Sequence, residues 1–247
     1  MILFPTIELQ NQRCVSLKRG RLEESSIWHV DPVQKAREFA EAGAEWMHVT
    51  DFNAIEGDQQ NEALVERIIR AAGIPVQLAG GFRTVDRVER WIDKGAARIV
   101  MGTAAVKTPD MVNHLANLHP DQVVLAMDVW NGHVLTDGWR EESMFTPNAF
   151  LDAYRNTPLA GVLYTDVHAD VGDADASLSA LAQISEYSRF PIVASGLVRT
   201  ADDLSRLKYA GHCHGTIIGR ALFEKSISLA EALEIARPDA VKTAEFI

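Results

Sequence analysis

Short apolar runs alternate with longer amphipathic segments along the whole chain. Each run is rich in valine, isoleucine, leucine or alanine and ends in a polar residue or glycine, as buried strands of a parallel sheet do. The predicted strands are Ile2–Glu8, Trp46–Phe52, Val76–Ala79, Arg98–Met101, Val123–Asp128, Gly161–Asp166, Ile192–Ser195 and Gly215–Ile218. Eight strands separated by helical segments predict one α/β domain, a single (β/α)8 TIM barrel.

The segments between the strands repeat apolar residues at helical spacing, and several begin at a residue suited to capping a helix. Asp31 precedes Pro32, Thr108 precedes Pro109, and Thr200 has an aspartate three residues later. The predicted helices are Asp31–Ala42, Asn61–Ala72, Thr84–Lys94, Pro109–Asn117, Ala176–Tyr187 and Thr200–Ala210. The length of 247 residues fits one barrel of this kind, which typically has about 250.

Motifs from the first part of the chain recur, in the same order, in the second part. Residues 50–58 (TDFNAIEGD) resemble residues 165–173 (TDVHADVGD), and residues 79–84 (AGGFRT) resemble residues 195–200 (SGLVRT). A third pair, around Gly102 and Gly219, follows in each part. An ordered repeat of this kind predicts two related (β/α)4 half-barrels, roughly residues 1–120 and 121–247.

Glycines follow the ends of several predicted strands, where barrels of this class bind their ligands. A glycine there lets backbone N–H groups approach a phosphate, although a tight strand-to-helix turn needs glycine for its own sake. Because the glycine turns come in two matched sets, we favour two anion sites and a ligand with a phosphate at each end. The candidates are Gly80, Gly81 and Gly102 in the first half, and Gly196 and Gly219 in the second.

Two carboxylates, Glu8 and Asp128, end apolar strands that lie opposite one another in the predicted barrel. A carboxylate in that position is costly unless it is solvated, paired or used in chemistry. Two acids that face each other across a ligand suit general acid–base catalysis, whereas the alternative role is to hold a loop through backbone hydrogen bonds. Asp51 and Asp166 occupy equivalent repeat positions, and we expect them to be structural. His48 is interpreted as a packing residue.

Composition narrows the possible partners. The net charge of −10 argues against general affinity for nucleic acid or for an anionic membrane, and no apolar run is long enough to span a bilayer. Cys14 and Cys213 lie far apart without a CxxC partner, which predicts reduced thiols and a cytoplasmic location. The run His212-Cys213-His214 lies before the last strand, away from the expected site. We therefore expect no metal there.

The chain resembles the phosphoribosylformimino-aminoimidazole carboxamide ribotide (ProFAR) isomerases of histidine biosynthesis over nearly its whole length. The sister cyclase of the pathway fits the first strand and the Gly-Trp segment less well. The segments that carry the resemblance are Phe4-Pro5-Thr6-Ile7-Glu8-Leu9, Gly80-Gly81-Phe82-Arg83, Gly102-Thr103-Ala104-Ala105-Val106, Met127-Asp128, Gly138-Trp139, Ala194-Ser195-Gly196 and Ile218-Gly219-Arg220-Ala221-Leu222.

This resemblance implies an Amadori rearrangement of a diphosphorylated ribosyl imidazole carboxamide, without cofactor or metal. We expect the chain to be a monomer. It implies Asp128 as the acid, Glu8 as the base and Trp139 as an aromatic cover for the ligand. The residues implied for one phosphate are Gly81, Arg83, Gly102 and Thr103, and those for the other are Ser195, Gly196, Gly219 and Arg220.

Four departures from the family pattern fall at positions of this proposed site. Glu8 replaces an aspartate, which moves the carboxylate by about 1.5 Å if the backbone stays in place. Ser16 replaces an arginine, Gly172 a threonine and Leu197 a glycine. Three hypotheses follow: an isomerase of the family reaction, a barrel that acts on a related phosphosugar, and a catalytically silent paralogue that serves as a binding partner.

Overall fold

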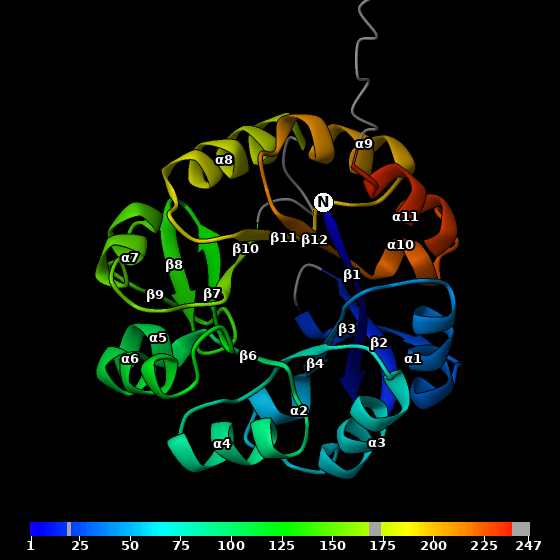
Figure 1. The fold of residues 1–247 in the computed structure, drawn as a ribbon, viewed down its shortest axis with the longest axis horizontal. Coiled ribbons are helices and arrows are strands. Elements are labelled where there is room, and N and C mark those ends of the chain that lie inside the picture. The colour runs from blue at the N-terminus through cyan, green and yellow to red at the C-terminus, as the bar shows by residue number, and fades with distance from the viewer. Residues whose placement is uncertain (19–20, 168–173, 239–247) are drawn as a thin grey trace, which may run out of the picture.

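The computed structural model describes residues 1–18, 21–167 and 174–238. Eight parallel strands form a closed barrel surrounded by helices (Figure 1). They pair in the order β10, β11, β12, β1, β4, β5, β6, β7, and the pairing of β7 with β10 closes the sheet. Their bounds are β1 (Ile2–Gln10), β4 (Met47–Asp51), β5 (Val76–Ala79), β6 (Arg98–Met101), β7 (Val123–Trp130), β10 (Gly161–Asp166), β11 (Ile192–Ser195) and β12 (Gly215–Ile218). The predicted (β/α)8 barrel is confirmed.

Two strands run past their predicted ends because each continues into an antiparallel hairpin. β1 pairs with β2 (Arg13–Lys18), which pairs with β3 (Arg21–Trp28). β7 pairs with β8 (His133–Thr136), and β9 (Glu141–Glu142) follows. The turn between β7 and β8 has left-handed backbone at Asn131 and Gly132, with φ of 48° and 81°. Such a turn matches the twist of a two-residue hairpin. The hairpin of β2 and β3 was not predicted.

The predicted helices form with ends shifted by only a few residues. They are α1 (Pro32–Glu41), α3 (Glu62–Ala72), α4 (Val85–Asp93), α6 (Pro109–Leu118), α8 (Ala174–Tyr187) and α9 (Ala201–Ala210). Further helices are α2 (Phe52–Ile55), α5 (Thr103–Lys107), α7 (Pro147–Ala153), α10 (Arg220–Phe223) and α11 (Leu229–Ala236). Asp31 and Thr200 cap their helices through side-chain hydrogen bonds, as predicted. Thr108 is the N-cap residue of α6, as predicted, but its side chain forms no capping hydrogen bond, because its hydroxyl donates to the carbonyl of Ala104.

Alternate residues of each strand face opposite sides of the barrel wall, and two separate cores result. The outer core lies between the strands and the helices. The inner core fills the barrel and consists of Phe4, Val100, Val124, Ala160, Leu163, Val193 and Ile217. At the N-terminal end of the barrel, Trp46 packs on Phe4 and beneath the guanidinium of Arg98, 4.3 Å from the ring centre. The inner face is therefore closed at this end and free to form a site at the other.

The turn after β5 approaches α2 so closely that it has no room for a side chain. A Cβ atom at Gly81, where φ is +66°, would lie 2.0 Å from the carbonyl oxygen of Ala54. Gly73, at the end of α3, has the same φ of +66° but no atom within 4 Å of its Cβ position. A comparison of Gly73 with Gly81 therefore separates the free-energy cost of left-handed backbone from the cost of a steric clash.

We expect Gly73→Ala to lower the free energy of unfolding by about 1 kcal/mol, the cost of left-handed backbone for alanine. Gly81→Ala should lower it by about 2–4 kcal/mol, because the clash with Ala54 adds to the same backbone cost. Urea titrations of both variants measure the difference. Equal losses of unfolding free energy in the two variants would show that α2 moves away from the new side chain at no energetic cost.

Candidate functional site

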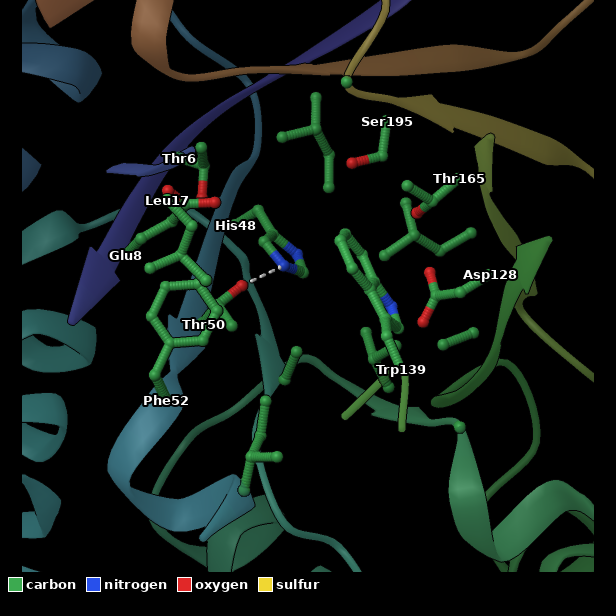
Figure 2. A pocket seen from close by; sticks show the side chains of 18 of the residues that line it. Thr6, Glu8, Leu17, His48, Thr50, Phe52, Asp128, Trp139, Thr165 and Ser195 are labelled. Carbon is green, nitrogen blue, oxygen red and sulfur yellow. Dashed lines mark hydrogen bonds between the residues drawn. The ribbon is translucent and has the colours of Figure 1, made fainter. Parts of the chain in front are cut away.

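A cavity of about 350 Å³ lies at the C-terminal ends of the barrel strands, and all eight of them contribute residues to its wall (Figure 2). Every candidate residue from the sequence lines this cavity: Glu8, Gly80, Gly81, Arg83, Gly102, Thr103, Asp128, Trp139, Ser195, Gly196, Gly219 and Arg220. The barrel thus brings together residues from both halves of the chain.

Glu8 and Asp128 stand on opposite walls of the cavity (Figure 2). They come from β1 and β7, and in the closed sheet three strands separate these two strands on either side. A ligand in the cavity therefore lies between the two carboxylates. This arrangement gives one side of the ligand access to a proton donor and the other side access to a base.

The environment of Asp128 favours its protonated form. Burial raises the pKa of this carboxyl, while hydrogen bonds from the side chains of Trp139 and Thr165 oppose the rise. Thr165 is the register partner of Asp128 on β10. Because its proton is retained to higher pH, Asp128 is suited to act as a general acid.

Trp139 reaches Asp128 from a loop with unusual backbone. Asp137, Gly138 and Trp139 are consecutive residues with left-handed φ, a conformation that costs free energy at the two non-glycine positions. The first half-barrel holds this loop: the Thr103 hydroxyl accepts from the Asp137 N–H at 2.9 Å, and Lys107 pairs with Asp137. These contacts offset the strain and fix the indole beside the carboxyl.

The glycine turns of the two halves follow similar backbone paths. Gly102 has φ of −103° and ψ of −84°, and Gly219 has φ of −129° and ψ of −89°. Gly80 and Gly196, which the repeat aligns, both have positive φ, at 136° and 80°. The two paths differ one residue later, because Gly81 has φ of +66° whereas the aligned Leu197 has no positive φ.

Two arginines are fixed close to these turns. The guanidinium of Arg83 donates to the carbonyl of Ile55 at 2.8 Å, and that of Arg220 donates to the carbonyl of Leu17. Both residues line the cavity. The glycine turns of each half therefore have one arginine beside them, which suits a ligand that carries two anionic groups.

The departures from the family pattern have local structural counterparts. Leu197 packs against the outer core and does not line the cavity, so its bulk does not occupy the second glycine turn. Ser16 accepts a hydrogen bond from the Trp28 indole at 3.0 Å, and Trp28 stacks on Phe223 of α10. Gly172 lies outside the described residues.

The two other aspartates serve mainly the framework. Asp51 is buried, caps α2 by accepting from the Ala54 N–H at 3.3 Å, and accepts from the Asn61 side chain at 2.8 Å. Asp166 accepts from the hydroxyl of Ser177 on α8 at 2.6 Å, while also lining the cavity.

The cavity wall contains polar residues that the sequence interpretation missed. His48 was interpreted as a packing residue, yet it lines the cavity and forms hydrogen bonds with Thr50 and Gln77. Thr6 and Thr165 also line the cavity. Their positions alternate with apolar residues along the predicted strands, and this alternation is the signal that identifies inward-facing side chains.

Within the described residues, no group of three or more His, Cys, Asp and Glu side chains is arranged to hold a metal ion. In the same ranges, no helix combines the length and apolar character needed to cross a bilayer.

A (β/α)8 barrel with two carboxylates on opposite walls of a cavity at the C-terminal ends of its strands has the layout of barrel enzymes that act on small molecules. A family model described as "Histidine biosynthesis protein" matches residues 2–228, so the chain belongs to that family.

Curated relatives agree along the full length of the chain. It is 53% identical to isomerase 2 of Ruegeria pomeroyi and 52% identical to isomerase 1 of Ruegeria sp. strain TM1040, in both cases over 100% of each chain. An isomerase of Roseobacter denitrificans is 39% identical, over 95% of this chain and 98% of its own length. All three are named 1-(5-phosphoribosyl)-5-((5-phosphoribosylamino)methylideneamino) imidazole-4-carboxamide isomerases.

The raised pKa of Asp128 has a consequence for stability. The native state holds this proton more tightly than the unfolded chain, so above the ordinary value of 3.8 stability falls with rising pH until the native carboxyl ionises. Asparagine does not ionise. We therefore expect Asp128→Asn to become progressively more stable than the wild type from about pH 4 upward, as measured by urea unfolding.

Asp152 on α7 provides a control of opposite sign. Hydrogen bonds from Arg155 and Tyr187 lower its pKa, so Asp152→Asn should lose stability relative to the wild type at neutral pH and match it in acid. If both variants changed in the same direction with pH, burial would not be the cause at Asp128.

Proposed function

We propose that the chain is a ProFAR isomerase of histidine biosynthesis, which rearranges an aminoaldose into an aminoketose. The observation that carries the proposal is the pair of carboxylates, Glu8 and Asp128, on opposite walls of the cavity in a chain 53% identical to a named isomerase. The substrate name of that relative contains two phosphoribosyl groups, and this chain has two glycine turns with an arginine at each.

Asp128 opens the sugar ring in this proposal. Its carboxyl gives a proton to the ribose ring oxygen, the bond from C1 to that oxygen breaks, and the nitrogen lone pair forms a C1–N double bond. The raised pKa of Asp128 keeps the required proton available. Trp139 and Thr165 hold the carboxyl through hydrogen bonds, so both act as positioning residues.

Glu8 then acts as the base. It removes the proton from C2, and the electron pair of that bond forms a C1–C2 double bond while the C1–N bond returns to single. Loss of the C2 hydroxyl proton and protonation of C1 yield the ketone, so no oxidant or reductant is consumed. The extra methylene of glutamate extends the carboxylate further into the cavity from β1 than aspartate would.

The two phosphates are bound at opposite ends of the cavity. Gly80, Gly81, Arg83, Gly102 and Thr103 form one end. Ser195, Gly196, Gly219 and Arg220 form the other. Backbone N–H groups at these turns and the two guanidinium groups supply the donors that phosphate oxygens accept.

We further infer that the chain works as a cytoplasmic monomer that does not bind nucleic acid. Residues of one chain surround the cavity, the net charge is −10, and both Cys14 and Cys213 are free thiols. Analytical ultracentrifugation tests the oligomeric state, and a dimer would overturn that part of the proposal.

The purified chain should convert ProFAR to its ketose isomer. Asp128→Asn and Glu8→Gln should each lower kcat by about 10²–10⁴-fold, because each removes a proton-transfer group while keeping its size. Asp86→Asn, on the exposed face of α4, should leave turnover unchanged. An absorbance assay of the isomerisation measures all four proteins. Substrate binding without turnover in the wild type would favour a silent paralogue, and turnover of another phosphosugar would favour a changed substrate.

The phosphate assignment has a separate structural test. Crystals soaked in inorganic phosphate should show one anion near Gly81 and Thr103 and a second near Gly196 and Arg220. Arg83→Ala and Arg220→Ala should each raise the KM for ProFAR by about tenfold with little change in kcat, because ground-state binding is lost. An anion at only one end would indicate a ligand with a single phosphate.

A further inference from the structure

A chain of hydrogen bonds runs through the cavity wall between β5 and β4. The side-chain nitrogen of Gln77 lies 3.1 Å from Nδ1 of His48. Nε2 of His48 lies 2.9 Å from Oγ1 of Thr50, and Figure 2 shows this second hydrogen bond. Gln77 is completely buried and His48 is 3% exposed. The catalytic steps described above use none of these three residues.

The amide of Gln77 determines the direction in which these hydrogen bonds are donated. An amide nitrogen only donates, so Nδ1 of His48 accepts from Gln77 and the ring proton is on Nε2. That N–H then donates to the hydroxyl oxygen of Thr50. Burial lowers the pKa of His48 to about 3, so the ring stays neutral and carries a single N–H at neutral pH.

The direction of the chain decides where the hydroxyl hydrogen of Thr50 points. Because the His48 N–H faces the oxygen of Thr50, the hydroxyl hydrogen of Thr50 points elsewhere. Thr50 lines the cavity and is the register partner of Glu8 on the adjacent strand β1. The Thr50 hydroxyl is therefore available to donate a hydrogen bond to a ligand in the cavity, next to the proposed base Glu8.

We propose that the Thr50 hydroxyl donates a hydrogen bond to the C2 oxygen of the opened sugar, with His48 and Gln77 as its positioning residues. The inference rests on the proposed function. Glu8 removes the proton of C2 to give an enol, and when the enol becomes the ketone the oxygen on C2 loses its proton and gains negative charge. A fixed donor beside the base stabilises this oxygen as the change occurs.

The test uses isosteric changes at two threonines of the barrel strands, one inside the cavity and one outside it. Thr50→Val should lower kcat for ProFAR by about 10- to 100-fold with little change in KM, since the donor acts mainly in the transition state. Thr50→Ser keeps the hydroxyl and should retain most of the activity. Thr216→Val is the matched control, because Thr216 is a buried threonine of β12 that does not line the cavity and whose hydroxyl donates to the carbonyl of Ala194. It should leave kcat unchanged.

A binding measurement separates a contact with the ligand from a structural role of Thr50. In Thr50→Val the ketose product should bind about tenfold more weakly, while an analogue without the C2 oxygen should bind as it does to the wild type. Equal weakening of both ligands would overturn the proposal. Thr50→Ala provides a second variant for the same comparison if the valine protein unfolds.

The positioning role of His48 has a spectroscopic signature. Nitrogen-15 NMR of the wild type should show the Nε2–H tautomer at neutral pH. The Nδ1–H tautomer would mean that the hydrogen bonds are donated in the opposite direction, with Thr50 donating to His48, and would overturn the inference. Wild-type turnover with full activity in Thr50→Val would refute the inference alone, whereas absence of wild-type turnover would refute the proposed function itself.

Discussion

Closure of the parallel sheet is the constraint on which the rest of this structure depends. Pairing of β7 with β10 forces every second residue of all eight strands to face one axis. Apolar inward residues fill the barrel up to the level of Phe4 and Leu163, and polar ones follow towards the C-terminal ends. The cavity is lined by all eight strands as a direct result. The inward-facing side chains nearer the N-terminal ends pack against one another, whereas those at the C-terminal ends face the cavity.

The two halves of the barrel are coupled through their functional loops as well as their strands. Trp139 belongs to the second half, but its loop is held by Thr103 and Lys107 from the first. Similarly, Arg220 at the end of the second half donates to Leu17 in the hairpin that follows β1. A half-barrel alone would lack one carboxylate and the anchors of its own loop, so the site exists only in the complete barrel.

The fold was largely predictable because each barrel strand is a short apolar run bounded by glycine or a polar residue. β5, β6, β10, β11 and β12 have the predicted bounds. The candidate residues at glycine turns and strand ends were found for the same reason. Ser16 and Trp28 lie on β2 and β3, an antiparallel pair that no apolar periodicity in the sequence reveals. His48 was missed because its neighbours are apolar, although its inward position follows from alternation with Thr50.

Burial shifts the pKa values of the acid and the imidazole of this cavity in opposite directions, and in both cases it favours the neutral form. It raises the pKa of Asp128 and lowers that of His48, since a low-dielectric environment disfavours the charged form of either group. The arginines of the cavity wall, Arg83, Arg199 and Arg220, follow the glycine turns of the two halves, where the phosphates of the proposed substrate would lie. Between them, the proposed reaction uses the carboxyl of Asp128, whose protonated form is favoured, and the carboxylate of Glu8 as the base. In such a site, changes such as Ser16 and Leu197, whose side chains contact protein groups, alter local packing without placing a new charge beside the reacting atoms.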